Sequence, residues 1–190
     1  MESNYEALVE ACARDDRRAQ QQLYQMCFPF LVRISRRYAK DNEEAVDLLN
    51  LAFVKIIQNL KSFQDQTHFE SWAKRVTITV CIDEYRKQKR HTSRFVATED
   101  EKLTYYDNEK SENEGFANLK ADDIMKLIQQ LPGLTKEVLN LVAIDGFSHQ
   151  ESGNLLGITE AASRWHLHRA RQIMKEKMEN LHKISSNHTQ

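Results

Sequence analysis

Helix-breaking residues are scarce in this sequence. Its 190 residues include 5 glycines and 2 prolines, against 29% charged and 41% hydrophobic residues. No apolar run approaches the length of a membrane span, and the N-terminal stretch has early acids and no apolar core, so a signal peptide is not expected. This composition is typical of a helical, water-soluble protein with enough apolar material for two modest cores.

Cysteine is also scarce, and no motif points to a catalytic or metal centre. Cys12, Cys27 and Cys81 lack paired spacing and lie among apolar neighbours, so we expect buried free thiols in a reducing cytoplasm. The histidines include no pair at metal-ligand spacing beside acids, and the sequence has no glycine-rich phosphate loop or nucleophile motif. We therefore expect no enzymatic activity, cofactor, metal ion or small-molecule substrate.

An excess of one charge is absent as well, since the formal net charge is -1. This value does not suggest a nucleic-acid binder, but the charges are segregated along the chain. Residues 93–120 have no sustained apolar period and contain more acids than bases. We predict a flexible acidic linker there, joining helical domains at 1–92 and 121–182, with a polar tail at 183–190. Proteases should cut such a linker first.

Helical apolar spacing organises the first domain. Residues 5–27 should form a helix that the pair Asp15-Asp16 can divide in two, and Pro29 should begin the next helix. Asn42 is the expected cap of a helix whose apolar residues recur from Ala45 to Leu60. That apolar stripe is wider than one core face requires. A surface for a partner protein and a central helix buried on two sides explain it equally well.

Thr67 and Glu70 form a capping box that opens a further helix, which runs to Arg90. The β-branched run at 76–80 is compatible with a strand, but unbroken helical spacing from Phe69 to Tyr85 favours a helix. Its expected buried residues are Phe69, Trp72, Ala73, Val76 and Val80, and the outward ones include Lys74, Arg75, Ile78 and Thr79. The basic end, with aromatic residues nearby, can hold a nucleic-acid strand by charge and stacking. Complementing the helix dipole is the ordinary alternative for those basic residues.

The second domain should begin with two helices. The apolar residues between Ile124 and Leu131 form the first, and Pro132-Gly133 ends it. Thr135 should cap the next helix, and Gly146 should end it. The residues expected inside are Val138, Leu139, Leu141, Val142 and Ile144.

A helix-turn-helix pattern follows, from Ser148 to Arg171. Ser148 and Glu151 form a capping box, Gly157 ends the first helix, and Thr159 can cap the second. In the second helix the residues with inward spacing are Ser163, Leu167, Ala170 and Met174. The opposite face carries Ala161, Arg164, Trp165 and His168, flanked by Arg169 and Arg171. That face can hydrogen-bond base edges and phosphates in a major groove, whereas a helical hairpin with a solvated basic side is the plain alternative.

Both halves resemble bacterial sigma factors. The segment from LPGLTKEVLNLVAIDGFSHQESGNLLGIT to LHRAR resembles region 4, and DLLNLAFVKIIQNLKSF together with FESWAKRVTITVCIDEYRKQKR resembles region 2. Only these two regions are present, which is the layout of the extracytoplasmic-function (ECF) group. The resemblance implies an all-α protein that binds core RNA polymerase and directs it to promoters, recognising a distant element as duplex and an upstream element as a melted strand. An anti-sigma factor is a further partner that the resemblance allows.

The resemblance also assigns site residues. Binding of core polymerase is expected at Asp47, Leu48, Leu51, Phe53 and Ile56. Binding of the melted element is expected at Phe63, Trp72, Lys74, Arg75, Thr79, Arg86, Lys87 and Arg90. Binding of the distant element is expected at Lys136, Thr159, Glu160, Arg164, Trp165, His168, Arg169 and Arg171.

Four departures from the family pattern bear on the promoter sequence rather than on the role, and they leave open a weakened or specialised paralogue. Thr79 replaces a common Asn, Leu51 a usual Glu, Ser152-Gly153 a usual Ile-Ala pair, and Trp165 a small residue. Glycine within a helix costs about 1 kcal/mol relative to alanine. The alternatives are a helix-turn-helix regulator that does not act as a sigma factor, and an interaction module that has lost DNA binding.

Overall fold

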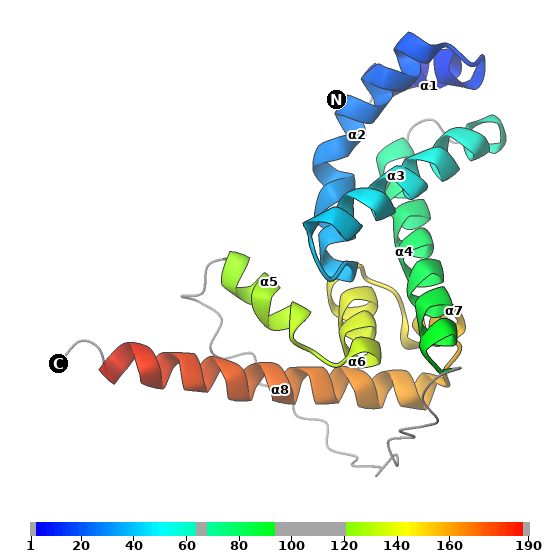
Figure 1. The fold of residues 1–190 in the computed structure, drawn as a ribbon. Coiled ribbons are helices and arrows are strands. Elements are labelled where there is room, and N and C mark those ends of the chain that lie inside the picture. Colours follow the sequence, from blue (N-terminus) through cyan, green and yellow to red (C-terminus); the bar gives the residue numbers. More distant parts are fainter. Residues whose placement is uncertain (1–2, 64–67, 94–120, 188–190) are drawn as a thin grey trace. The chain divides into compact units, whose positions relative to one another are not determined.

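The computed structural model describes residues 3–63, 68–93 and 121–187, drawn as ribbon in Figure 1. Within these ranges the chain is helical and contains no strand, so the predicted all-α class is confirmed. The chain divides into two compact units, Met1–Val96 and Ala97–Gln190, which are described separately below. The predicted linker at 93–120 lies outside the described residues, apart from Ser93.

Unit one contains α1 (Ser3–Ala13), α2 (Arg17–Tyr38), α3 (Asn42–Asn59), the short 3-10 helix η1 (Leu60–Ser62) and α4 (Phe69–Ser93). Helices α2, α3 and α4 pack pairwise against one another, and α1 packs against α2 and η1. The core side chains come from all four α-helices and include the three cysteines, which are buried and free as predicted.

The start of unit one confirms one predicted boundary and corrects two. Asp15 has a left-handed φ of 64° and Asp16 caps α2, so the aspartate pair does divide the first helical stretch. The prediction that Pro29 begins a new helix is wrong, because α2 runs through it. Proline removes one helical hydrogen bond, but the buried stripe continues on one side of α2 from Leu23 to Tyr38, and this packing maintains the helix. The cap of α3 is Asp41, one residue before the predicted Asn42.

Helix α4 confirms that the β-branched run at 76–80 is helical. The prediction that Ile78 faces outward is wrong, because its side chain is 4% exposed. The neighbouring Thr77 is also buried, and its hydroxyl donates to the Ala73 carbonyl oxygen at 2.8 Å, which satisfies a polar group inside the core. The predicted cap Thr67 lies outside the described residues.

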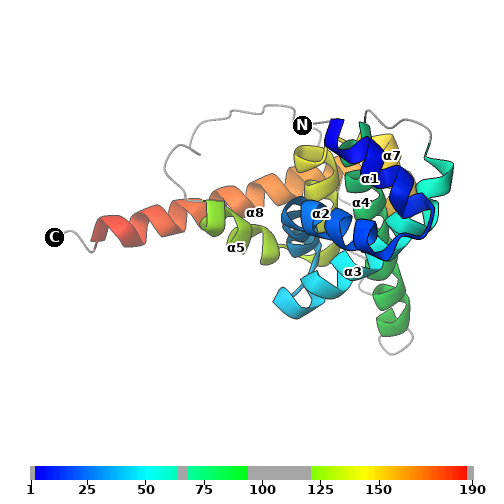
Figure 2. The same cartoon turned by 90° about the horizontal axis from the view of Figure 1, so that it is seen from above.

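Unit two contains α5 (Ala121–Gln129), α6 (Gly133–Val138), the π-helical segment η3 (Leu139–Ile144), α7 (His149–Leu156) and α8 (Glu160–Asn187). The long helix α8 packs against each of the other four elements. Figure 2 shows α8 continuing past α5 toward the C-terminus. None of the described helices has the length and apolar character needed to cross a membrane.

Two predictions about the helix before the hairpin are wrong. Thr135 does not cap it, because α6 begins at Gly133 and Thr135 is a buried residue within its first turn. Ile144 is not inside, because its side chain is 43% exposed at the end of η3. The predicted end at Gly146 is confirmed by a left-handed φ of 77°, which glycine adopts without steric cost.

Candidate nucleic-acid interface

The turn between α7 and α8 has the predicted helix-turn-helix geometry. The Ser148 hydroxyl accepts from the Glu151 N–H at 3.1 Å, and the Glu151 carboxylate accepts from the Ser148 N–H at 2.9 Å, which completes the capping box. Gly157 ends α7 with a φ of 72°. The Thr159 hydroxyl accepts from the Ala162 N–H at 3.1 Å and so caps α8. Each cap thus satisfies one of the unpaired N–H groups in the first turn of its helix, which favours the start of α8 at this point.

Gly153 lies directly under this turn. The N–H groups of Gly157 and Ile158 both donate to the Gly153 carbonyl oxygen, the latter at 3.0 Å. A Cβ atom on Gly153 would lie 2.8 Å from the carbonyl oxygen of Ile158, closer than real Cβ contacts come. The glycine that departs from the family pattern is therefore accounted for by this close backbone approach.

One side of α8 is buried as predicted and the other is open. Ser163, Leu167, Ala170 and Met174 are all buried against the rest of unit two. We call Ala161, Arg164, Trp165 and His168 the reading face, which lies away from that core. Ala161 and Arg164 are exposed, Trp165 and His168 are half-buried, and the flanking Arg169 and Arg171 are exposed. The helix therefore presents cationic, aromatic and imidazole groups on one accessible side.

Acidic neighbours moderate the charge of this surface. The Arg164 guanidinium forms an ion pair with Glu160 one turn earlier. Lys136, which sequence analysis assigns to DNA, lies on α6, and its side chain is 14% exposed with Nζ 3.4 Å from a carboxylate oxygen of the buried Glu137. The structure therefore places Lys136 off the reading face, held beside a buried acid. Thr159 and Glu160 act here as the cap and the ion-pair partner.

Two histidines that sequence analysis did not assign connect α8 to the helices packed on its buried side. The Nδ1 atom of His166 is 3.0 Å from the Thr135 hydroxyl of α6, and the Nδ1 atom of His149 is 2.9 Å from the Ser163 hydroxyl. Burial, followed by the nearby Arg164 charge, lowers the pKa of His149 below its usual 6.5. These contacts join α8 to α6 and α7. In the sequence, the burial of His166 was indicated by its position next to the inward-facing Leu167 in the helix.

A second accessible face runs along α4 in unit one. Trp72, Arg75, Thr79, Arg86 and Arg90 recur at steps of three, four or seven residues, which places them on one side of the helix. Arg75, Thr79, Arg86 and Arg90 are exposed, and Trp72 is half-buried. We call these five residues the strand face. Phe63 stacks on Trp72 with ring centroids 4.6 Å apart and an interplanar angle of 29°. The structure thus brings together an aromatic pair and a row of cations.

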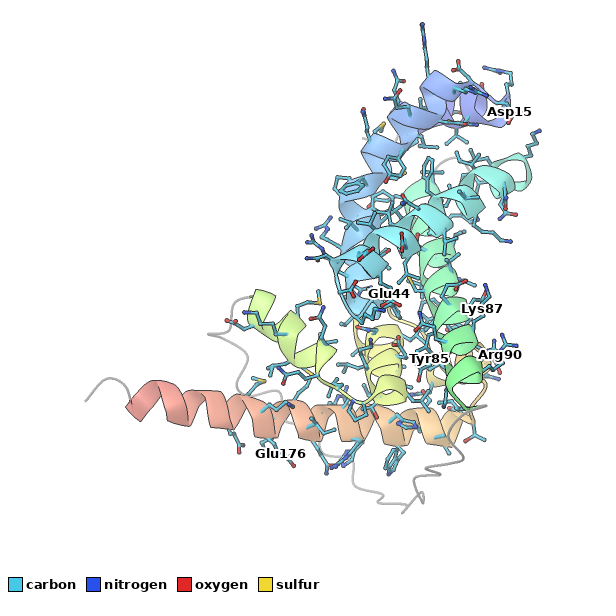
Figure 3. All side chains as sticks on the ribbon, viewed as in Figure 1. Asp15, Glu44, Tyr85, Lys87, Arg90 and Glu176 are labelled. Carbon is cyan, nitrogen blue, oxygen red and sulfur yellow. The ribbon has the colours of Figure 1, made fainter. Side chains whose placement is uncertain are left out.

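Two lysines assigned to the melted element do not share the strand face. Lys74 lies on the side of α4 toward α2, where its ammonium is 5.7 Å from the centre of the Phe30 ring and 2.7 Å from a Glu70 oxygen. Lys87 lies beside the strand face, paired with Glu84 at 2.5 Å. In Figure 3, Lys87 and Arg90 project from the opposite side of α4 to Tyr85. Lys74 thus lies off the strand face, on a partly exposed side of α4 where Glu70 and Phe30 are its neighbours.

The basic end of α4 is held by α3. One oxygen of the Glu44 carboxylate accepts from the Gln88 amide at 2.7 Å, and the other accepts from the Lys40 N–H at 2.6 Å. Glu44 thus completes the start of α3 and fixes the segment of α4 that carries Arg86 and Arg90. Figure 3 shows Glu44 at the end of α3 from which it reaches α4.

The outer side of α3 is a third accessible surface. Asp47, Leu51 and Val54 recur at steps of four and three residues, and all three are exposed, Leu51 by 49% and Val54 by 54%. Phe53 is half-buried against the Tyr24 ring, with centroids 5.0 Å apart. Leu48 and Ile56, also assigned to polymerase binding, are 5% and 0% exposed. These two side chains therefore belong to the core beneath the surface, while Val54, which sequence analysis did not assign, is exposed on it.

The described residues contain no group of three or more histidine, cysteine or acidic side chains able to hold a metal ion. The surfaces found are instead suited to macromolecules. One is a helix-turn-helix with a cationic reading face, one is an aromatic and basic helix, and one is an apolar patch beside an acid.

Comparisons with known proteins agree with this set of surfaces. The family model for sigma-70 region 2 matches residues 23–91, and the model for sigma-70 region 4 matches residues 121–174. The RNA polymerase sigma factor SigZ of Bacillus subtilis strain 168 is 30% identical over 151 residues, which cover 80% of this chain and 81% of that protein. The ECF sigma factor SigW of the same organism is 26% identical over 167 residues, 84% of each chain. The chain belongs to the ECF group of RNA polymerase sigma factors.

A solved structure shares the fold of this sigma factor. It is the sigma factor RpoE in complex with the anti-sigma factor NepR from Bartonella quintana, with a TM-score of 0.52 and 20% identity over 82% of this chain and 94% of that one. The region 2 match begins within α2, so α1 precedes it. Helix α1 nevertheless contacts α4, because the centre of the Tyr5 ring lies 5.0 Å from the centre of the Phe69 ring.

Proposed function

We propose that this sigma factor binds core RNA polymerase in the cytoplasm and directs it to promoters by recognising two DNA elements, without catalysis of its own. The observation that carries the proposal is the presence of three accessible surfaces on matched sigma regions in one chain. A helix-turn-helix regulator of the ordinary kind would account for the reading face alone. It would not account for a region 2 match that contains the strand face and the outer side of α3.

The reading face of α8 is proposed to enter the major groove of the distant element. Capping fixes α8 at its first residue, and the reading-face side chains begin in its first turn, which is the part of a recognition helix that reaches base edges. Arg164 is the candidate for a bidentate contact to guanine, while Arg169 and Arg171 flank the groove and suit phosphates.

The strand face of α4 is proposed to bind the melted element. The Phe63–Trp72 pair offers a ring surface on which an unstacked base can lie, and Arg75, Arg86 and Arg90 offer charges along the same side of the helix. Stacking combined with a row of cations is the usual way in which proteins hold single-stranded nucleic acid. Thr79 lies on the same face between Arg75 and Arg86, so it is placed to contact the strand between two phosphate contacts.

The outer side of α3 is proposed to bind core polymerase. Exposed Leu51 and Val54 beside Asp47 combine apolar area with one charge, a pattern typical of protein interfaces and costly to leave in water. An anti-sigma factor is a further proposed partner, supported by the anti-sigma complex of the similar Bartonella protein. It would act by covering one of these surfaces.

The decisive experiment is transcription in vitro. The purified full chain is added to bacterial core RNA polymerase and a DNA library with a randomised promoter region, and the RNA 5′ ends are sequenced. We expect transcripts from a subset of templates that share two elements upstream of the start. Core enzyme alone is the control. RNA no greater than that control, together with DNA binding by the chain on its own, would instead support a plain regulator.

The contacts of the reading face and of the strand face should differ in their dependence on base sequence and on salt. Replacing Arg164 with alanine removes a base contact worth about 1–3 kcal/mol of discrimination, so activity should fall unevenly across variants of the distant element. Replacing Arg86 removes a phosphate contact, which carries no sequence information. Arg86→Ala should weaken promoter binding uniformly and reduce its dependence on salt, because fewer counterions are released. The measurement is holoenzyme binding over a salt series with a panel of base substitutions. The reverse pattern would show that the two surfaces are wrongly assigned.

A further inference from the structure

Trp165 lies near the middle of the open side of α8. Successive residues of an α-helix turn by about 100°, so a residue two positions after the buried Ser163 and two before the buried Leu167 faces almost directly away from the core. Trp165 occupies that position in the second turn of α8, between Ala161 and His168 of the reading face. A large aromatic side chain is thus presented where the helix would meet the floor of a groove.

The indole ring is held in place from the core side. It packs edge-on against the His166 ring, with centroids 4.8 Å apart and an interplanar angle of 82°. His166 is 8% exposed and is itself fixed by the hydrogen bond between its Nδ1 atom and the Thr135 hydroxyl of α6. The support therefore runs from α6 through a buried imidazole to the indole. A ring supported in this way loses little conformational entropy on binding.

The chemistry of indole limits what it can recognise. The ring is apolar, with one N–H donor and no acceptor. Among the base edges of the major groove, only thymine presents an apolar group, its 5-methyl, which projects into the groove. The short side chain of Ala161, one turn before Trp165, leaves room for the indole to approach it. We propose that Trp165 makes this sigma factor select thymine in the distant promoter element by contact with the 5-methyl group.

This inference rests on the proposed function, and the test keeps the two apart. The holoenzyme, made from the full chain and bacterial core polymerase, first selects binding sites from a DNA pool with a randomised upstream segment. Each thymine in the enriched site is then replaced singly by deoxyuridine, which lacks only the methyl group. Affinities are measured for the wild type and for Trp165→Ser, Trp165→Phe and Arg164→Ala. Thermal melting of each variant shows whether unit two stays folded.

We expect one or two thymines at which deoxyuridine weakens wild-type binding about fourfold, since burying one methyl group contributes about that factor. Trp165→Ser should bind both bases equally at those positions. Trp165→Phe, which keeps an apolar ring, and Arg164→Ala, which leaves the indole in place, should both retain the preference for thymine.

Three results would overturn the inference. Deoxyuridine could be bound as well as thymine at every position, or Trp165→Ser could keep the methyl preference, which would assign the contact to another residue. The third result uses the same sites with each guanine replaced singly by 7-deazaguanine. If that replacement weakens binding of the wild type and not of Trp165→Ser, the indole N–H reads guanine. Failure of the proposed function has a different signature, because the holoenzyme would then enrich no sequence at all.

Discussion

Replacing Gly153 with alanine tests the geometry of the helix-turn-helix most directly. Helix propensity alone predicts that the change stabilises unit two by about 1 kcal/mol. The structure predicts otherwise, because the new Cβ would lie 2.8 Å from the Ile158 carbonyl oxygen. The turn cannot move away freely, since the N–H groups of Gly157 and Ile158 are both bonded to the Gly153 carbonyl. Overpacking of this kind costs about 1–3 kcal/mol, so we expect a net destabilisation of roughly 0–2 kcal/mol.

The two tryptophans provide a local assay. Trp72 belongs to unit one and Trp165 to unit two, so Trp165 is the only tryptophan in a Trp72→Phe background. Urea unfolding followed by its fluorescence then reports the free energy of unfolding of unit two. A clear rise in that free energy for Gly153→Ala would refute the close-approach argument.

Gly157 provides the matched control. Nothing lies within 4 Å of a Cβ built there, and the position requires glycine only for its left-handed φ of 72°. Asparagine tolerates that conformation, so Gly157→Asn should cost less than about 1 kcal/mol. Gly153→Asn should cost clearly more, because space rather than backbone conformation is limiting. Equal effects of asparagine at the two positions would show that the two glycines are not required for different reasons.

Three further predictions address the remaining surfaces and buried groups. Asp47→Arg should reduce co-purification with core polymerase at unchanged helical content, while Glu6→Arg on α1 should have no effect. Burial lowers the pKa of His149 below 6.5, so the stability that the neutral imidazole contributes is present above pH 6.5 and is lost as the pH falls. Between pH 7 and pH 5, wild-type unit two should therefore lose more stability than the His149→Gln variant. Burial raises the pKa of Cys12 from 9.0 to about 11 and that of Cys27 to about 12. A thiol reagent at pH 8 should therefore label the native chain far more slowly than the unfolded chain. The stability that these neutral thiols contribute should be lost as the pH rises above 9.

Local signals in the sequence were sufficient for the helix-turn-helix. The capping box at Ser148 and the cap at Thr159 are each formed by residues three positions apart, and the left-handed conformation of Gly157 is one that glycine itself allows. Such interactions depend little on the rest of the fold, so residue type and spacing predict them. The burial of Ser163 and Met174 followed from helical period alone, which is equally local.

Three of the predictions that differ from the structure depend on contacts with other helices. Pro29 breaks helices by its local chemistry, yet the long buried side of α2 overrides it. Thr135 has the local chemistry of a cap, but it is used inside α6 by His166, which is 31 residues away in the chain. Lys74 is partly exposed, but its place beside Phe30 of α2 and away from the strand face depends on a residue in another helix. No periodicity within one helix contains this information.

Ion pairs within single helices explain how near-zero net charge is compatible with DNA binding. Glu84 pairs with Lys87 on α4, and Glu160 pairs with Arg164 on α8, in each case one turn away. Exposed pairs of this kind contribute only about 0.2–1 kcal/mol, whereas a phosphate or guanine contact forms a charge-assisted, often bidentate hydrogen bond. The cations can therefore leave their acids when DNA arrives, and the acids weaken contact with sites that offer charge alone. The proposed bidentate base contact would compensate Arg164 for the lost ion pair, and a contact with charge alone would do so less well. The pairing would therefore raise selectivity at a small cost in affinity.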